Sequence, residues 1–129
     1  MQMNLIEELA AHLEYCGFGT AASAEQDGDI HWGRMPDSPD DCICVFSTDS
    51  GVGGVDSTAR IQIMNRARST RTAYETSFAI AQELDDFSGF LHGDGRSVNI
   101  EVVNAATGLG PDSVKREVYV TNIAVKYCN

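Results

Sequence analysis

The sequence is poor in basic side chains. It holds 9 lysines and arginines against 19 aspartates and glutamates, which gives a formal charge of −10 at pH 7. A protein that binds the phosphates of DNA or RNA needs a basic surface. The acid excess therefore argues against a tightly bound nucleic acid, although net charge says nothing about the fold.

Long hydrophobic runs are also missing from the 129 residues. No segment approaches the ~20 apolar residues of a membrane-spanning helix. No apolar stretch typical of a secretory signal precedes the first amphipathic segment. We expect a cytosolic origin, reduced thiols and no membrane partner, in a single domain over residues 1–129.

Cysteines are few, and only two of the four lie close together, Cys42 and Cys44. In a strand these two share one face and lie too far apart to form a disulfide comfortably. No second pair of cysteines or histidines follows at zinc spacing. We interpret both as small core residues; a metal or redox role is the alternative.

Catalytic motifs are missing as well. The chain has no Gly-x-Ser-x-Gly, no His-Glu-x-x-His and no phosphate-binding Walker loop. We therefore expect no catalytic, cofactor-binding or metal-binding residues, no cofactor, and a protein that is not an enzyme. The alternative is a small metal-dependent hydrolase that uses His31 and His92 with the acidic turn of Asp37, Asp40 and Asp41.

What the sequence does contain is clear periodicity. Asn4–Tyr15 has apolar residues at the helical period, with Asn4 and Glu7 placed as a capping box. Pro36 and Pro39 favour a turn. Strands are predicted over Ile30–Arg34, Cys42–Ser47, Thr58–Arg66, from Val98 to Val102, and over Glu117–Tyr127.

A second helix is predicted from residue 70 to about Ser88. Its inner stripe consists of Ala73, Ser77, Ile80, Ala81, Leu84 and Phe87, widened by Tyr74 and Phe78. Ala105–Ser113 is rich in glycine and predicts a loop. The predicted fold is α+β, with a mainly antiparallel sheet of about four to five strands packed against two helices.

One basic cluster stands out in this acidic chain. The segment at 65–71 reads NRARSTR and carries Arg66, Arg68 and Arg71 where a strand ends and a helix begins. Such an edge can dock an acidic neighbour, including another copy of the chain; a solvated turn is the alternative. We take these three arginines, with Asp49 and Asp56, as candidate subunit-interface residues.

Five segments together resemble the minor capsid or tail-terminator proteins of long-tailed bacteriophages, which are also described as tail-completion or head-to-tail joining proteins. The segments are NLIEELAAHLE, GRMPDSPDDCICVFSTDSG, ARIQIMNRA, TAYETSFAIAQELDDF and GLGPDSVKREVYVTNIAVKY. They span nearly the whole chain, and the most distinctive is Met35 to Gly51, with its Pro-Asp-Ser-Pro-Asp turn.

The resemblance implies a structural virion protein located in the tail or neck and assembled in the host cytoplasm. It implies a homo-oligomeric ring, in this family typically a hexamer, that ends the tail at its head-proximal side. The tail tube protein and a head-tail connector or stopper protein are the implied partners, and DNA passes through without specific binding. Another head-tail connector, a head-completion protein and a host-cell binding module are the alternatives.

Overall fold

The fold was analysed in a computed structural model, which describes residues 4–23, 27–47, 56–92 and 96–128. The side chains of Asp56, Ser57 and Cys128 are outside this description, as is the candidate interface residue Asp49. Among the described residues, no helix is both long and apolar enough to cross a membrane.

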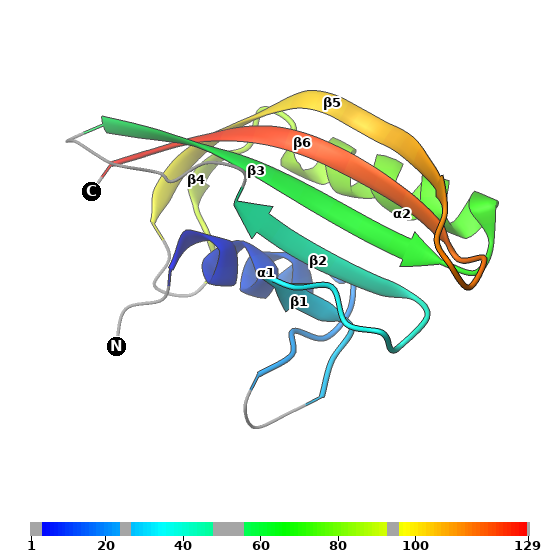
Figure 1. Cartoon of the computed structure of the whole chain (residues 1–129). Coiled ribbons are helices and arrows are strands. Elements are labelled where there is room, and N and C mark those ends of the chain that lie inside the picture. The colour runs from blue at the N-terminus through cyan, green and yellow to red at the C-terminus, as the bar shows by residue number, and fades with distance from the viewer. Residues whose placement is uncertain (1–3, 24–26, 48–55, 93–95, 129) are drawn as a thin grey trace.

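A single curved sheet organises the chain (Figure 1). Its strands lie in the order β1-β2-β3-β6-β5-β4. Five pairings join them, of which β1 with β2 is parallel and the other four are antiparallel. The bounds are β1 Ile30–Trp32, β2 Cys42–Ser47, β3 Asp56–Ala67, β4 Ser88–Phe90, β5 Ser97–Pro111 and β6 Glu117–Cys128.

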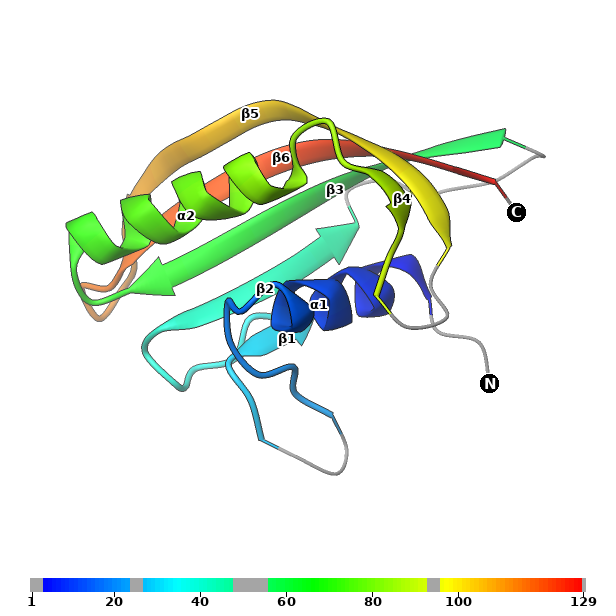
Figure 2. The same cartoon turned by 180° about the vertical axis from the view of Figure 1, so that it is seen from behind.

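Both helices, α1 Leu5–Tyr15 and α2 Thr70–Leu84, lie on one face of this sheet (Figure 2). Helix α1 covers β1 and β2, and α2 covers β3, β5 and β6. Apolar residues of both helices share one core with alternate residues of the strands. Leu9, Leu13, Ile61, Ile63 and Ile80 are at most 1% exposed.

The predicted helix starts are confirmed. The side chain of Asn4 accepts the backbone N–H of Glu7 at 2.8 Å, and that of Ser69 accepts the N–H of Thr72 at 3.3 Å. Each bond satisfies a backbone donor that has no partner inside its helix. Strand Cys42–Ser47 is also confirmed, and it pairs with β3 in the antiparallel sense.

The predicted loop over Ala105–Ser113 is wrong, because β5 continues to Pro111. Its register against β6 shifts three times, between Val102 and Asn104, Asn104 and Thr107, and Gly108 and Gly110. Bulges of this kind interrupt strict alternation and accommodate unusual backbone angles, here a φ of 86° at Gly110.

The strand count is six rather than four to five, because α2 ends at Leu84 and the chain then forms β4. Asp85 leaves the helix in an extended conformation and Asp86 has a φ of 58°. Phe87 then accepts the N–H of Ile100 at 2.8 Å through its backbone oxygen. Phe87 still packs on the core, which explains why the helical stripe seemed to run on.

Tyr74 and Phe78 do not widen the inner stripe of α2, contrary to the prediction. They are 45% and 44% exposed, whereas Ala73 and Ser77 beside them are fully buried. Ser77 places its hydroxyl 3.0 Å from that of Thr121 on β6, which satisfies both polar groups in the core.

His12 is a buried titratable group where α1 meets the end of β4. It is 4% exposed, and its Nδ1 accepts the backbone N–H of His92 at 3.1 Å. Burial lowers the pKa of His12 below its ordinary value of 6.5, opposed by Glu83 and reinforced by His92. Folding therefore favours the neutral imidazole.

This burial gives a pH-dependent term in stability. When folding lowers the pKa of a histidine, its contribution to the free energy of unfolding is fully present above the unfolded pKa. That contribution is lost as the pH falls below about 6.5. In His12→Asn, the amide oxygen replaces Nδ1 as acceptor and does not titrate. Urea unfolding between pH 7.5 and pH 5 should show a steeper loss of stability in the wild type than in His12→Asn. Parallel pH profiles would contradict the assignment.

Candidate functional site

The Pro-Asp-Ser-Pro-Asp turn is held by a buried arginine. Arg66 is 5% exposed and lies near the end of β3. Its guanidinium donates to the backbone oxygens of Pro36 at 2.7 Å, Pro39 at 2.6 Å and Asp40 at 3.0 Å. All three nitrogens of the fork are thus engaged, which compensates the burial of its charge.

A second arginine ties the same turn to the connection between β5 and β6. Arg116 donates to the backbone oxygen of Asp37 at 2.5 Å and to Oδ2 of Asp112 at 2.8 Å. Asp112 also accepts the backbone N–H groups of Val114 and Arg116 at 3.0 and 2.9 Å. Mainly through these bonds with Arg116, the pKa of Asp112 is lowered below its usual range.

Asp40 of the turn contacts both Arg116 and a third arginine, Arg68. Its carboxylate lies 2.5 Å from the guanidinium of Arg68 and 3.3 Å from that of Arg116. The hydrogen bond from Arg68, followed by the contacts with Arg116, lowers the pKa of Asp40. Side-chain contacts thus join the turn, the end of β3 and the connection between β5 and β6 at one end of the sheet.

The predicted interface residues have different positions in the structure. Arg66 is internal, and its donors are all used within the chain. The side chains of Arg68 and Arg71 are 80% and 86% exposed, and Arg71 pairs with Glu75 at 2.9 Å. Asp56 begins β3 at the opposite end from Arg66.

The two neighbouring cysteines face the interior. Cys42 and Cys44 are 3% and 0% exposed. Burial raises the pKa of both thiols, that of Cys44 to about 12. A protonated buried thiol is a poor nucleophile and a poor metal ligand, so the structure favours the interpretation as core residues.

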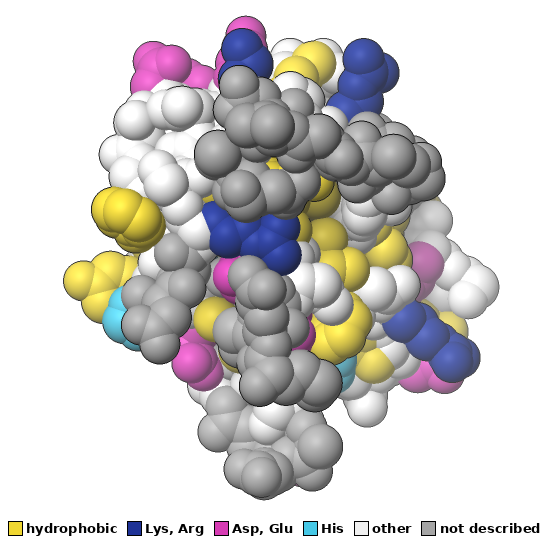
Figure 3. Space-filling view, turned by 90° about the vertical axis from the view of Figure 1, so that its left-hand side faces the viewer, with side chains coloured by type: hydrophobic (Ala, Val, Ile, Leu, Met, Phe, Trp, Pro, Cys, Tyr) yellow, Lys and Arg dark blue, Asp and Glu magenta, His cyan; other side chains and the backbone are white. Residues whose placement is uncertain are grey.

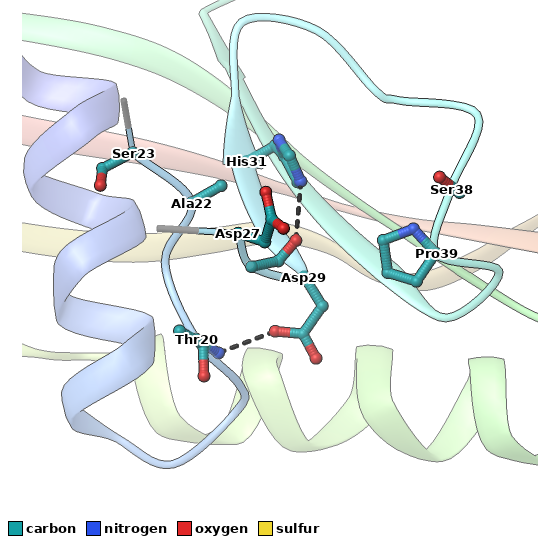
Figure 4. Close-up of a pocket in the computed structure, with 9 residues that line it drawn as sticks. Thr20, Ala22, Ser23, Asp27, Asp29, His31, Ser38 and Pro39 are labelled. Carbon is teal, nitrogen blue, oxygen red and sulfur yellow. Dashed lines mark hydrogen bonds between the residues drawn. The ribbon is translucent and has the colours of Figure 1, made fainter. Parts of the chain in front are cut away.

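His31 lies in a 710 Å³ hollow with Asp27 and Asp29 (Figure 4). Its Nε2 is 2.9 Å from the backbone oxygen of Gly28, and Asp29 accepts the N–H of Thr20 at 2.7 Å. These bonds hold the strand entering β1 in place. The hollow also reaches Ser38 and Pro39 at the rim of the arginine-held turn.

His92 is placed elsewhere, with its ring stacked on Tyr15 at 4.1 Å between centroids. The acidic turn is engaged by arginines and not by either histidine. Within the described ranges, no three histidine, cysteine, aspartate or glutamate side chains gather closely enough to hold a metal ion. The geometry offers no support for the hydrolase alternative.

The sequence did not reveal Arg116 and Asp112 as partners of the turn. Their spacing of four residues suggests only a local pair, and Arg116 reaches Asp37 across 79 residues of chain. Contacts between residues so far apart in the sequence depend on the order of the strands in the sheet. Periodicity alone does not predict that order.

The arginine-held turn contributes to stability. Replacing Arg66 by Met removes three hydrogen bonds to one buried charged group and leaves the carbonyls of the turn without these donors. We expect the free energy of unfolding, measured in urea, to fall by about 2–4 kcal/mol. Arg71→Met, at an exposed ion pair, should leave the free energy of unfolding close to that of the wild type. Equal effects would contradict the assignment.

Comparison with known proteins gives one family. The model of the family described as "Bacteriophage tail terminator protein" matches residues 19–129. No curated protein matches the chain significantly. A solved structure is similar over 78% of this chain and 77% of its own, with a TM-score of 0.49 and 10% identity, a likeness too distant to add to the assignment.

The family match covers the arginine-held turn, all six strands and α2. It confirms the resemblance and includes four of the five sequence segments; the first, at residues 4–14, lies outside the match. The chain belongs to the bacteriophage tail terminator protein family.

Proposed function

We propose that this chain is the subunit of a ring at the head-proximal end of the tail of a long-tailed bacteriophage. The ring, a hexamer in this proposal, stops growth of the tail tube and joins the tail to the neck. The observation that carries the proposal is the family match over residues 19–129. Assembly takes place in the host cytoplasm, and the finished protein resides in the virion.

The charge of the chain is compatible with this role. A formal charge of −10 repels DNA phosphates, so a channel wall built from such subunits would let DNA pass without holding it. The tail tube protein on one side of the ring and a connector or stopper protein on the other are the proposed partners.

The geometry of the arginine-held turn also suits a structural part. A segment fixed by Arg66 and Arg116 presents a constant surface at the end of the sheet. Surfaces that are already ordered lose less conformational entropy when they associate. Arg68 and Arg71, exposed at this same end, are the proposed subunit contacts, together with Asp49 and Asp56.

The proposal is tested in the phage that encodes the chain. Removing its gene should give tails of uncontrolled length that do not join filled heads, and the wild-type chain supplied in trans should restore joined particles. Electron microscopy of labelled protein should place it at the neck. Absence from purified virions would overturn the proposal, and a location on tail-free heads would instead favour a head-completion protein.

A further inference from the structure

Helix α2 carries a group of contacting aromatic rings on its solvent side. Tyr74 and Phe78 stack with centroids 6.0 Å apart, and Tyr119 on β6 meets Tyr74 edge-on at 5.9 Å. We call these three residues the aromatic pad. The ring of Tyr119 packs closely against the backbone at Gly108, where an added Cβ would come within 3.2 Å of the ring. The pad is therefore an ordered apolar surface where a helix normally presents polar side chains.

Exposed arginines lie beside the aromatic pad. Arg71 precedes Tyr74 by three residues, and Arg68 stands just before the helix. Their side chains are 86% and 80% exposed, so each keeps donors free beyond its one intramolecular carboxylate. Helix α2 has no acidic residue in its first turn and no basic residue in its last. The helix dipole favours the opposite arrangement, so Arg68 and Arg71 do not stabilise the helix through its dipole.

A second aromatic surface lies where the end of α1 meets the end of β4. It consists of Tyr15, 66% exposed and stacked on His92, and Phe90, 72% exposed. Figure 3 looks onto the β4 end, where apolar side chains reach the surface beside a histidine. Two exposed acids flank this surface: Glu14 precedes Tyr15, and Glu83 accepts a hydrogen bond from Cys16 at 3.6 Å.

The two surfaces differ in flanking charge and in position. The start of α2 and β4 lie toward opposite ends of the sheet (Figure 1). The pad is bordered by two arginines, each with one carboxylate partner on its own chain (Asp40 for Arg68 and Glu75 for Arg71), and the other surface is bordered by two glutamates. The remaining arginine donors can meet the glutamates of a second copy, whereas two identical end surfaces would bring glutamates together. Two copies of a chain with a charge of −10 repel one another, which favours contact at the places where opposite charges meet.

We propose that the aromatic pad of one copy binds the Tyr15–Phe90 surface of the next, with Arg68 and Arg71 facing Glu14 and Glu83. Because the two surfaces are different, the contact is heterologous and repeats by rotation until a ring closes. This inference rests on the proposed function and specifies which surfaces join its subunits.

The test uses two full-length variants, each with one surface disabled and no new charge. The pad variant carries Tyr74→Gln and Phe78→Gln, and the end variant carries Tyr15→Gln and Phe90→Thr. Analytical ultracentrifugation follows association with rising concentration. We expect each variant alone to need about 30-fold higher concentration than the wild type for equal association. Their equimolar mixture should stop at dimers with one copy of each, because one intact pad meets one intact end.

A matched control variant, Trp32→Gln with Val114→Thr, removes exposed apolar side chains outside both surfaces. It should associate as the wild type does, and all variants should keep their urea midpoints within the range of surface substitutions. A mixture that contains only monomers, or a pad variant that assembles normally, would overturn the inference.

If the wild type stays monomeric in solution, the same four proteins are compared for retention on purified tails. Retention of wild type and control but loss of both surface variants supports the inference, and equal retention of all four overturns it. Failure of the proposed function gives a different result, because the wild-type chain itself is then absent from the virion neck.

Discussion

The end of the sheet depends on one buried charge. Arg66 is placed on β3 with almost no exposure, and its burial is tolerable because three backbone oxygens of the turn surround its guanidinium. The turn needs such a donor for its own reasons. Pro36 and Pro39 lack an N–H group and cannot donate to a strand ladder, which favours a turn here. The backbone oxygens of this turn then need donors from outside the sheet. The arginine and the proline-rich turn are each incomplete without the other.

This constraint positions the surface around the start of α2. Arg116 extends the network to the connection between β5 and β6, and Asp40 joins it to Arg68. The strand that bears Tyr119 and the helix that bears Tyr74 both start at this end. A turn held by arginines, rather than by apolar packing, leaves the end of the sheet polar but fixed. The exposed arginines and aromatic rings beside it are therefore presented in a defined arrangement.

Sequence periodicity was sufficient for α1, β3 and β6, because each buries one face and alternates or repeats regularly. For β2, whose first four residues are all buried, a short continuous apolar run was sufficient. It failed for the second half of β5, where bulges break the alternation, and for the end of α2, where Phe87 continues the apolar stripe after the helix has ended. It also failed for Tyr74 and Phe78, since an aromatic residue beside a buried position fits either side of a stripe. The role of Arg66 could not be read, because its partners lie 26 to 30 residues away.

One of these failures, at Tyr74 and Phe78, coincides with the surface that we propose for contact between copies. A helix that only had to cover the sheet would need Ala73, Ser77, Ile80 and Leu84 and could carry charges on its outer side. Instead its outer side holds stacked rings, and its flanking charges oppose its own dipole. The contacts among the rings add to the stability of the single chain, but they leave Tyr74 and Phe78 45% and 44% exposed. In the proposed contact, a second copy covers this remaining apolar surface. Apolar burial then supplies the attraction, while the arginine–glutamate contacts decide which surfaces meet and offset part of the repulsion between two acidic chains.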